Sequence, residues 1–317
     1  IHRLKSMDKE ILCSVCVISY NQERFIQQTL DSILSQKTDF RFELLISDDA
    51  SKDNTQKIIK EYELQYPNVI RNISRSKNVG SQKNFYSTME EAKGKYIALC
   101  EGDDYWIDSN KLQKQVTFLE ENPEYGLIYA QAKLFHNAKQ RFYRKPIGGP
   151  VLTFEDIYVN GSRIPTQTTC FRKDLFKKYI EEIKPLKKNW LLGDLPLWLW
   201  FYYNSKVYYS PDIVAVYRKL ESSASHSKDF EKQKLFERSR YEVRNFYKTH
   251  YKLDLPLEWN ENSIDFNIAF HQFDRKRILQ CEFKTLEKKE KIVWLLAHSK
   301  ILFFCIKKIY FLSKGVF

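Results

Sequence analysis

The sequence predicts an α/β fold: a mostly parallel sheet with helices on both faces. Three short apolar runs, each long enough for a buried strand, alternate over residues 11–100 with stretches whose apolar residues recur at helical spacing. Strand and helix in alternation build βαβ units, which place parallel strands side by side. The sequence lacks the patterns G-x-G-x-x-G and G-x-x-x-x-G-K-[ST], so neither a dinucleotide-binding fold nor a P-loop fold is expected.

The expected elements follow one another along the first hundred residues. In chain order they are a strand at 11–19, a helix at 23–36, a strand at 42–49, helices at 54–66 and 84–93, and a strand at 95–100. After residue 150 the pattern is mixed, and beyond His226 charged helical segments follow. We therefore expect a first domain over residues 1–225 and a helical basic extension over residues 226–317.

Polar and acidic residues follow each of the three strands. The first strand ends in Ser19-Tyr20-Asn21, the second in Asp48-Asp49, and the third in Glu101-Gly102-Asp103-Asp104. In parallel sheets, ligands bind beyond the carboxyl ends of the strands, so these groups are expected to converge. Carboxylates this close repel each other, and their desolvation is unfavourable without a positive partner. The edge is therefore either solvated or built to receive a cation.

Composition and charge limit the class of protein. Hydrophobic residues make up 43% of the chain, which predicts a folded core. The six cysteines lie mostly in apolar runs, as buried thiols of a cytosolic protein do. Cys13 and Cys16 spell C-x-x-C, but residues three apart on a strand face opposite ways, so buried thiols are expected rather than a metal site. The net charge of +12 permits nucleic-acid or anionic-membrane binding.

The end of the chain is basic and apolar. Residues 291–317 contain five lysines and no acid, and Lys300, Lys307 and Lys314 fall on one side of a helix. Two interpretations remain open. Such a helix lies in the interface of an anionic membrane, or it packs against the first domain or a second subunit of a homo-oligomer.

Five motifs, in order, cover about residues 12–220: VISYNQERFIQQTLDSILSQ, ELLISDDASKDNT, NVGSQKNF, AKGKYIALCEGDD and LGDLPLW. Together they resemble the family 2 glycosyltransferases, largely inverting enzymes of the GT-A fold that use nucleotide sugars. The EGDDYW stretch is similar to that of bacterial enzymes that build capsule, lipopolysaccharide or other surface glycans. The resemblance implies a GT-A catalytic domain with a helical C-terminal extension.

The resemblance also implies a nucleotide-sugar site. Ser19, Tyr20 and Asp49 match positions that line the nucleotide pocket, with Asp49 accepting from the uracil imide. The alternative for Asp48 or Asp49 is an N-cap of the following helix. Lys83 resembles a cation near the base and diphosphate, and is otherwise a solvated lysine.

A divalent cation, Mn²⁺ or Mg²⁺, is implied at the D-x-D-D position. Asp103 is expected as its direct ligand, with Glu101 towards the ribose or a metal-bound water; Glu here replaces the usual Asp. Hard oxygen ligands suit both cations. His226 matches a late histidine near the metal or diphosphate in several relatives, and is alternatively a structural or solvated histidine.

Other residues are assigned to the acceptor. Asp194, alone in an apolar stretch, matches the catalytic base, which takes the proton of the acceptor hydroxyl; its alternative is an N-cap of the next helix. Asp104 is expected to face the acceptor. Trp106 and Trp190 either border the acceptor cleft or belong to the core.

The resemblance thus implies an inverting glycosyltransferase that moves a sugar from a nucleotide-diphosphate sugar, with UDP as the expected carrier, to a hydroxyl of a glycan or lipid-linked acceptor. A cytoplasmic location is expected, with peripheral association to the inner face of the membrane as an option. The enzyme rival is a nucleotidyltransferase of similar topology, whose G-x-G-T-R loop the sequence lacks. The alternative that is not an enzyme is a basic nucleic-acid-binding protein, and only the net charge favours it. A nucleic-acid partner is therefore not expected.

Overall fold

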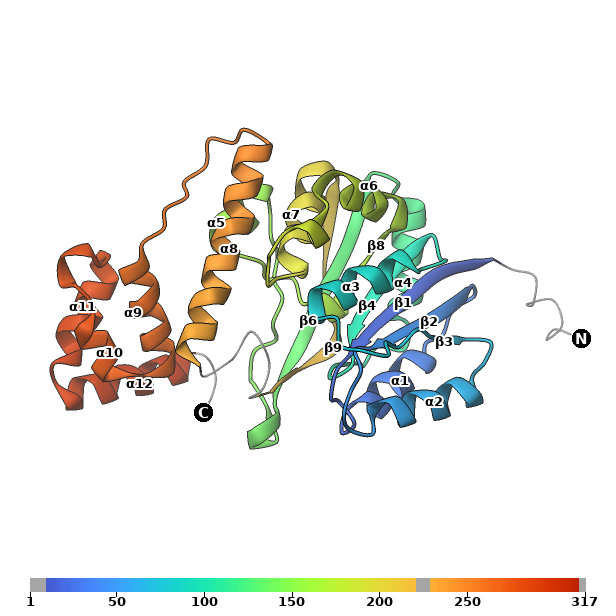
Figure 1. The fold of residues 1–317 in the computed structure, drawn as a ribbon, viewed down its shortest axis with the longest axis horizontal. Coiled ribbons are helices and arrows are strands. Elements are labelled where there is room, and N and C mark those ends of the chain that lie inside the picture. The colour runs from blue at the N-terminus through green and yellow to red at the C-terminus, as the bar shows by residue number, and fades with distance from the viewer. Residues whose placement is uncertain (1–9, 221–228, 314–317) are drawn as a thin grey trace, which may run out of the picture. The chain divides into compact units, whose positions relative to one another are not determined.

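The computed structural model describes residues 10–220 and 229–313, with side chains described as far as residue 310 (Figure 1). The chain divides into two compact units. The first takes the described parts of Ile1–Phe135 and Pro146–Arg218, and the second those of His136–Lys145 and Lys219–Phe317. The division near residue 218 falls slightly before the expected boundary at 225, and residues 136–145 group with the second unit.

The strands of the chain form one mixed sheet. They are β1 (Ile11–Ser19), β2 (Arg41–Asp48), β3 (Ile70–Asn72), β4 (Tyr96–Glu101), β5 (Tyr105–Trp106), β6 (Tyr125–His136), β7 (Arg141–Phe142), β8 (Cys170–Arg172) and β9 (Lys206–Lys219). Their order is β3-β2-β1-β4-β8-β6-β9-β5, with β7 off this path. The strands from β3 to β4 are parallel, as predicted, whereas β8 runs antiparallel to β4 and β6, and β5 antiparallel to β9.

Helices of the first unit cover both faces of the parallel strands. They are α1 (Ile26–Leu34), α2 (Thr55–Gln65), α3 (Ser81–Glu90), α4 (Lys111–Glu121), α5 (Phe154–Asn160), α6 (Lys173–Ile183) and α7 (Asp194–Asn204), with short 3₁₀ turns η2 (Thr166–Thr168) and η3 (Pro185–Lys187). In Figure 1, α1 and α2 lie side by side, and α3 lies on the other side of the strands. Apolar residues of β1, β2, β4, α1 and α4 form the core.

The order of the strands creates a switch point. From β1 the chain adds β2 and then β3 on one side, and then returns past β1 to place β4 on its other side. Right-handed crossovers therefore put α3 on the face opposite α1 and α2. Ligands of open α/β sheets bind at such a switch point, here between the carboxyl ends of β1 and β4.

The second unit is helical and has a core of its own. It contains α8 (Phe230–His250), α9 (Glu261–Gln272), α10 (Arg275–Gln280), α11 (Lys288–Ala297) and α12 (Lys300–Ser313), with the turns η1 (Asn137–Lys139) and η5 (Phe283–Thr285). Phe266, Ile278 and Phe303 are among the residues buried in its core. Within residues 10–220 and 229–313, no helix combines the length and the apolar character needed to cross a bilayer.

The cysteines are free thiols. Cys13 and Cys16 are both buried in β1 and point to opposite faces: Cys13 lies by Cys170, and the Cys16 thiol lies 4.0 Å from the carbonyl oxygen of Thr88 in α3. The prediction of buried thiols is confirmed. Burial raises the pKa of Cys16, and hydrogen bonding to Cys170 together with burial raises that of Cys13, so neither is a ready thiolate.

Candidate active site

The three strand ends converge as the sequence predicts. In the parallel register of the sheet, Ser19 of β1 lies opposite Asp48 of β2, and Ile18 lies opposite Glu101 of β4. The amide of Asp49 donates to the carbonyl of Ser19 (2.9 Å), and the amide of Gly102 to that of Ile18 (2.9 Å). The polar groups of three segments therefore line one edge of the sheet at the switch point.

Asp49 anchors the loop that leads into α3. Its Oδ1 accepts from the amide of Val79 (2.8 Å) and its Oδ2 from the amide of Gly80 (2.9 Å), while the Asn78 amide group donates to its carbonyl (3.0 Å). Gly80 has φ +90°, a conformation that favours glycine. The carboxylate is buried, and each oxygen keeps a second lone pair for a ligand.

Neither Asp48 nor Asp49 is the N-cap of the next helix. The N-cap of α2 is Asn54, whose side chain makes no capping bond. Asp48 closes a turn instead: its carboxylate accepts from the amide and hydroxyl of Ser51 and from Gln56 of α2. The carboxylate of Asp53 accepts from the Thr55 amide. The capping alternative for Asp48 and Asp49 is therefore wrong.

Ser19, Tyr20 and Lys83 surround this edge. The hydroxyl of Ser19 is buried and, within the described residues, has no hydrogen-bond partner. Tyr20 is 43% exposed just beyond β1. Lys83 is exposed in the first turn of α3, the helix that Asp49 anchors. His226 lies outside the described residues.

The acidic turn after β4 places the half-buried Glu101 and Asp103 beside the buried Asp104. Burial, with the charges of Asp103 and Asp194, raises the pKa of Glu101 to about 8. Burial also raises the pKa of Asp103. The Oε2 atom of Glu101 is buried and has no hydrogen-bond partner among the described residues. A carboxylate oxygen in this state lacks a donor or a cation.

Asp104 serves the structure of the turn. It is 1% exposed, and its Oδ1 accepts from the amide of Arg218 in β9 (2.7 Å). The Arg218 guanidinium donates to the carbonyl of Asp103 and lies over the ring of Tyr105, 4.4 Å from its centre. The hydroxyl of Thr29 in α1 donates to the carbonyls of Gly102 (2.9 Å) and Asp104 (2.6 Å). The expected acceptor-facing position of Asp104 does not match this burial, which leaves little of its side chain for a ligand.

The two tryptophans are buried. Trp106 donates its indole N–H to the carbonyl of Gln167 (2.8 Å), and the ammonium of Lys111 lies 4.1 Å from its ring centre. Trp190 is also buried, in the segment before α7. Their positions favour the core alternative over the border of an acceptor cleft.

Asp194 is the first residue of α7, and Gly193 is the N-cap. The Oδ1 atom of Asp194 accepts a hydrogen bond from the backbone amide of Leu195 (2.7 Å). Asp194 therefore occupies the first turn, where a negative charge is favourable, and the N-cap alternative is off by one residue. The charge of Asp194 is one of the causes that raise the pKa of Glu101, so Asp194 lies within electrostatic range of the acidic turn.

Helix α3 holds the segment before Asp194. The hydroxyl of Tyr86 donates to the carbonyl of Gly193 (2.6 Å), and the Gln82 side chain donates to that of Leu192 (3.4 Å). A Cβ at Gly193 would lie only 3.0 Å from the ring of Phe85. The same helix thus borders the Asp49 loop at its start and positions Asp194 through its middle.

The donors present fit a cation that a ligand helps to hold. Within the described residues, no three His, Cys, Asp or Glu side chains are grouped to hold a metal by themselves. Raised carboxyl pKa values and an unpartnered Glu101 oxygen are nevertheless what a missing positive partner produces. Divalent cations bound through one or two carboxylates and substrate phosphates need no complete protein cage.

Comparison with known proteins identifies the family. The family model described as glycosyl transferase family 2 matches residues 14–180, more than half of the chain. The chain belongs to glycosyl transferase family 2.

Relatives of this family 2 chain come from several bacteria. An uncharacterized protein of Mycobacterium tuberculosis is 32% identical over 228 residues, which are 71% of this chain and 63% of that protein. The putative glycosyltransferase EpsE of Bacillus subtilis is 29% identical over 189 residues, 60% of this chain and 66% of EpsE. The chain thus spans less than two thirds of the length of the mycobacterial relative.

Solved structures of low identity share the GT-A fold of this family 2 chain. TarS of S. aureus, residues 1–349 in complex with UDP-GlcNAc, has a TM-score of 0.53 at 20% identity, covering 92% of this chain and 88% of that one. The mannosyltransferase PcManGT of Pyrobaculum calidifontis, in complex with GDP-Man and Mn²⁺, has a TM-score of 0.57 at 14% identity, covering 96% and 81%.

The sequence did not reveal every residue of this family 2 site. Arg218 supports the acidic turn from a strand more than a hundred residues away, and Thr166 of η2 partly offsets the rise in the pKa of Glu101. Tyr86 holds the carbonyl before Asp194. A weak signal existed for Arg218 alone, since a cation that ends an apolar strand needs an acidic partner.

Proposed function

We propose that the protein transfers a sugar, with inversion, from a nucleotide-diphosphate sugar to a hydroxyl of a glycan or lipid-linked acceptor in the synthesis of a bacterial surface polysaccharide. The observation that carries the proposal is the edge of the sheet at the β1/β4 switch point, where Asp49, Glu101 and Asp103 meet the charge of Asp194. Membership of family 2 supports glycosyl transfer over nucleotidyl transfer and over nucleic-acid binding. Buried free thiols support a cytoplasmic location.

The donor lies against the strand ends in this proposal. Asp49 accepts from the imide of the base with the lone pairs that Val79 and Gly80 leave. The unpartnered Ser19 hydroxyl and the exposed ring of Tyr20 border the nucleoside, and Lys83 faces the diphosphate. UDP is the carrier we propose; the neighbouring structure of TarS contains UDP-GlcNAc, and that of PcManGT contains GDP-Man.

Asp103, assisted by Glu101, would hold Mn²⁺ or Mg²⁺ together with the phosphates; His226 is a further candidate ligand. When bound, the cation neutralises the charge that develops on the departing diphosphate. Glu101 and Asp103 hold the cation as two ionised carboxylates. Their mutual repulsion opposes this double ionisation until the cation is present. Arg218 and Thr29 hold the turn that carries them.

Asp194 acts as the general base in this proposal. It takes the proton from the acceptor hydroxyl as that oxygen attacks the anomeric carbon, on the side of the sugar opposite the diphosphate. Its place at the start of a helix favours the carboxylate form, which a base requires. Tyr86 and Gln82 fix the segment that carries it.

Asp194→Asn tests the proposal. The first step is to find, by thermal shift, a UDP-sugar that stabilises the protein with Mn²⁺, and then to measure the release of UDP. The variant keeps the size and the oxygen that Leu195 contacts, but cannot take a proton. It should bind the donor normally and lose transfer by about 10²-fold or more.

Asp174→Asn is the matched control, because Asp174 also lies in the first turn of a helix, α6, and is exposed. It should keep full activity, which separates catalysis from the effect of charge on a helix end. Near-normal turnover of Asp194→Asn would remove the base assignment. Failure of every nucleotide sugar to stabilise the parent would overturn the proposed reaction.

A further inference from the structure

The last two helices turn apolar side chains towards solvent. Phe303 of α12 is buried in the core of the helical unit, so this helix is packed through one side. Six large apolar side chains of the same pair of helices are exposed: Ile292 (53%), Leu295 (56%), Ile301 (76%), Leu302 (46%), Phe304 (65%) and Ile309 (64%). We call these six residues the apolar face.

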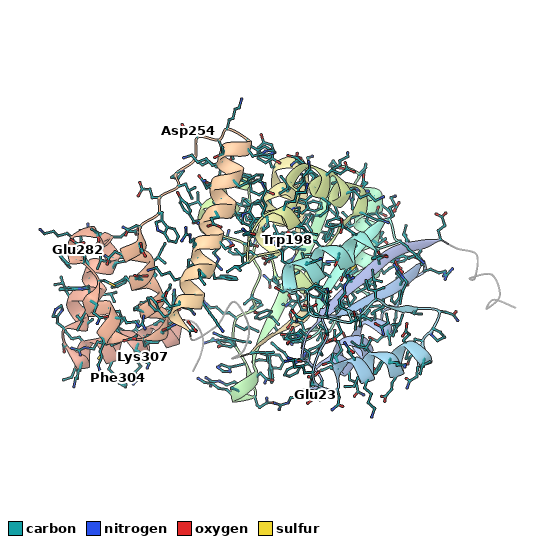
Figure 2. The ribbon with its side chains drawn as sticks, viewed as in Figure 1. Glu23, Trp198, Asp254, Glu282, Phe304 and Lys307 are labelled. Atoms are coloured by element: carbon teal, nitrogen blue, oxygen red, sulfur yellow. The ribbon has the colours of Figure 1, made fainter. Side chains whose placement is uncertain are left out.

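The apolar face occupies one side of α12, and the exposed Cys305 and Lys308 lie within the same arc. At 100° per residue, Phe304, Ile301, Ile309 and Leu302 fall within about 160°, opposite the buried Phe303. Phe304 and Lys307 are labelled in Figure 2. When a helix carries apolar side chains on its packed side and on its outer side, both sides are covered by protein or by lipid. An exposed patch of this kind marks an interaction site.

Exposed lysines lie within and beside the apolar face. Lys288, Lys289, Lys300 and Lys308 are exposed on α11 and α12, and residues 291–317 contain no acid. The one acid inside α11, Glu290, is buried and bonds to the amide of Glu287 and the hydroxyl of Ser263. Lys307 extends over the ring of Phe273, 5.0 Å from its centre, as a lysine does when its stem follows apolar surface.

We infer that α11 and α12 dock onto an anionic membrane surface, with the apolar face inserted at the level of the headgroups. The charge selects this occupant. A second copy would bring two lysine-rich surfaces together, whereas anionic lipids attract them, and acyl chains cover apolar side chains without any specific shape. The inference rests on these helices alone and does not depend on the proposed reaction.

Vesicle flotation of the full chain tests it. The protein should bind phosphatidylcholine vesicles that contain phosphatidylglycerol, and bind pure phosphatidylcholine much more weakly. The triple variant Ile301→Ser, Phe304→Ser, Ile309→Ser should reduce binding at least about tenfold. The double variant Lys300→Gln, Lys308→Gln should reduce it about fivefold for each lysine, equivalent to about 1 kcal/mol each.

Two control variants lie on α2 of the first unit: Leu64→Ser, which removes a leucine that is 73% exposed, and Lys60→Gln, which removes an exposed lysine. Both should bind vesicles as the parent does. If the melting curve shows that the triple variant does not fold, vesicle binding by the double lysine variant tests the inference instead. The inference is overturned if the parent ignores anionic vesicles, or if neither variant weakens binding. It is also overturned if the parent is a dimer that the triple variant dissociates without any vesicle binding.

Discussion

Asp103 lies between two carboxyl groups, those of Glu101 and Asp104, whose pKa values are raised by burial and by mutual repulsion. The charge of Arg218 offsets part of this repulsion, and the turn lowers the rest by retaining protons. A divalent cation has the same effect while leaving the oxygens ionised, so proton and cation compete for one turn. Metal affinity should therefore increase as pH rises towards the pKa of Glu101, about 8.

Asp103→Asn should separate two effects of this residue: charge repulsion in the free protein and binding of the cation together with the donor. The free protein should melt at the same temperature or higher, because one of the clustered charges is gone. The stabilisation by UDP-sugar with Mn²⁺, about 2.7 kcal/mol at one hundred times the Kd, should disappear. Asp108→Asn, at a carboxylate paired with Lys114 (2.9 Å), is the control and should retain it. Full donor stabilisation in Asp103→Asn would show that Asp103 is not a ligand.

Lys111 gives a pH dependence of stability. Its ammonium is fully buried, donates to Gln115 (2.8 Å), and has its pKa lowered by burial from 10.5 to about 8. Between these values the unfolded chain holds the proton and the folded protein releases it, so the free energy of unfolding rises with pH. At about 1.4 kcal/mol for each pKa unit, the gain is about 3 kcal/mol.

Lys111→Met should remove this dependence. Urea unfolding at pH 7 and pH 10.5 should show that the stability difference between parent and variant changes by about 3 kcal/mol in favour of the parent at high pH. Taking the difference cancels the tyrosines and cysteines that titrate in the same range. A difference independent of pH would mean that folding does not lower the pKa of Lys111.

At the scale of elements, α3 connects both halves of the candidate site. Its first turn adjoins the loop that Asp49 anchors, and its middle holds the carbonyl before Asp194 through Tyr86. The hydroxyl of Tyr86 donates to Gly193 and therefore accepts from Tyr179 of α6 (2.7 Å). Mutation can separate these two hydrogen bonds. The bond to Gly193 holds the segment before Asp194, whereas the bond from Tyr179 joins α6 to α3.

Tyr86→Phe should lower transfer and leave donor binding intact, because the segment before Asp194 loses its hydrogen bond. Stability should fall by about 1–3 kcal/mol, the cost of an unsatisfied buried polar group. Tyr179→Phe is the control: it loses the contact between the tyrosines but keeps the bond to Gly193. Rates of UDP release and melting curves distinguish them. Equal loss of activity in both variants would indicate general loosening rather than positioning.

The sequence predicted the elements that depend on local pattern. The β1, β2 and β4 strands, the helices between them and the convergence of Asp49 with Glu101 follow from periodicity and from the geometry of parallel strands. The antiparallel strands did not follow, because β8 and β9 pair with β4 and β5 over distances that no local pattern encodes. For the same reason Arg218 was missed, and the burial of Asp104, which accepts from the amide of Arg218 in β9, was not foreseen.

At the scale of the whole molecule, each unit has its own apolar core. Leu44, Ile46 and Val17 are fully buried in the core of the first unit, and Phe266, Ile278 and Ala297 are buried in that of the second. A domain with a complete core is stable without its neighbour's contacts. The proposed site lies wholly in the first unit, apart from His226, and the apolar face lies in the second.

Phe266→Ala should therefore unfold one unit and spare the other. Removing this buried ring should cost about 3–5 kcal/mol, a large part of the stability of a small helical unit. Hydrogen exchange should accelerate in peptides from residues 261–297 and stay slow in residues 11–101, while UDP-sugar with Mn²⁺ still protects the strand ends. Leu44→Ala, in β2, should give the reverse pattern and abolish donor binding. If Phe266→Ala accelerates exchange equally in both segments, the two units unfold together, and catalysis then depends on the helices that we assign to the membrane.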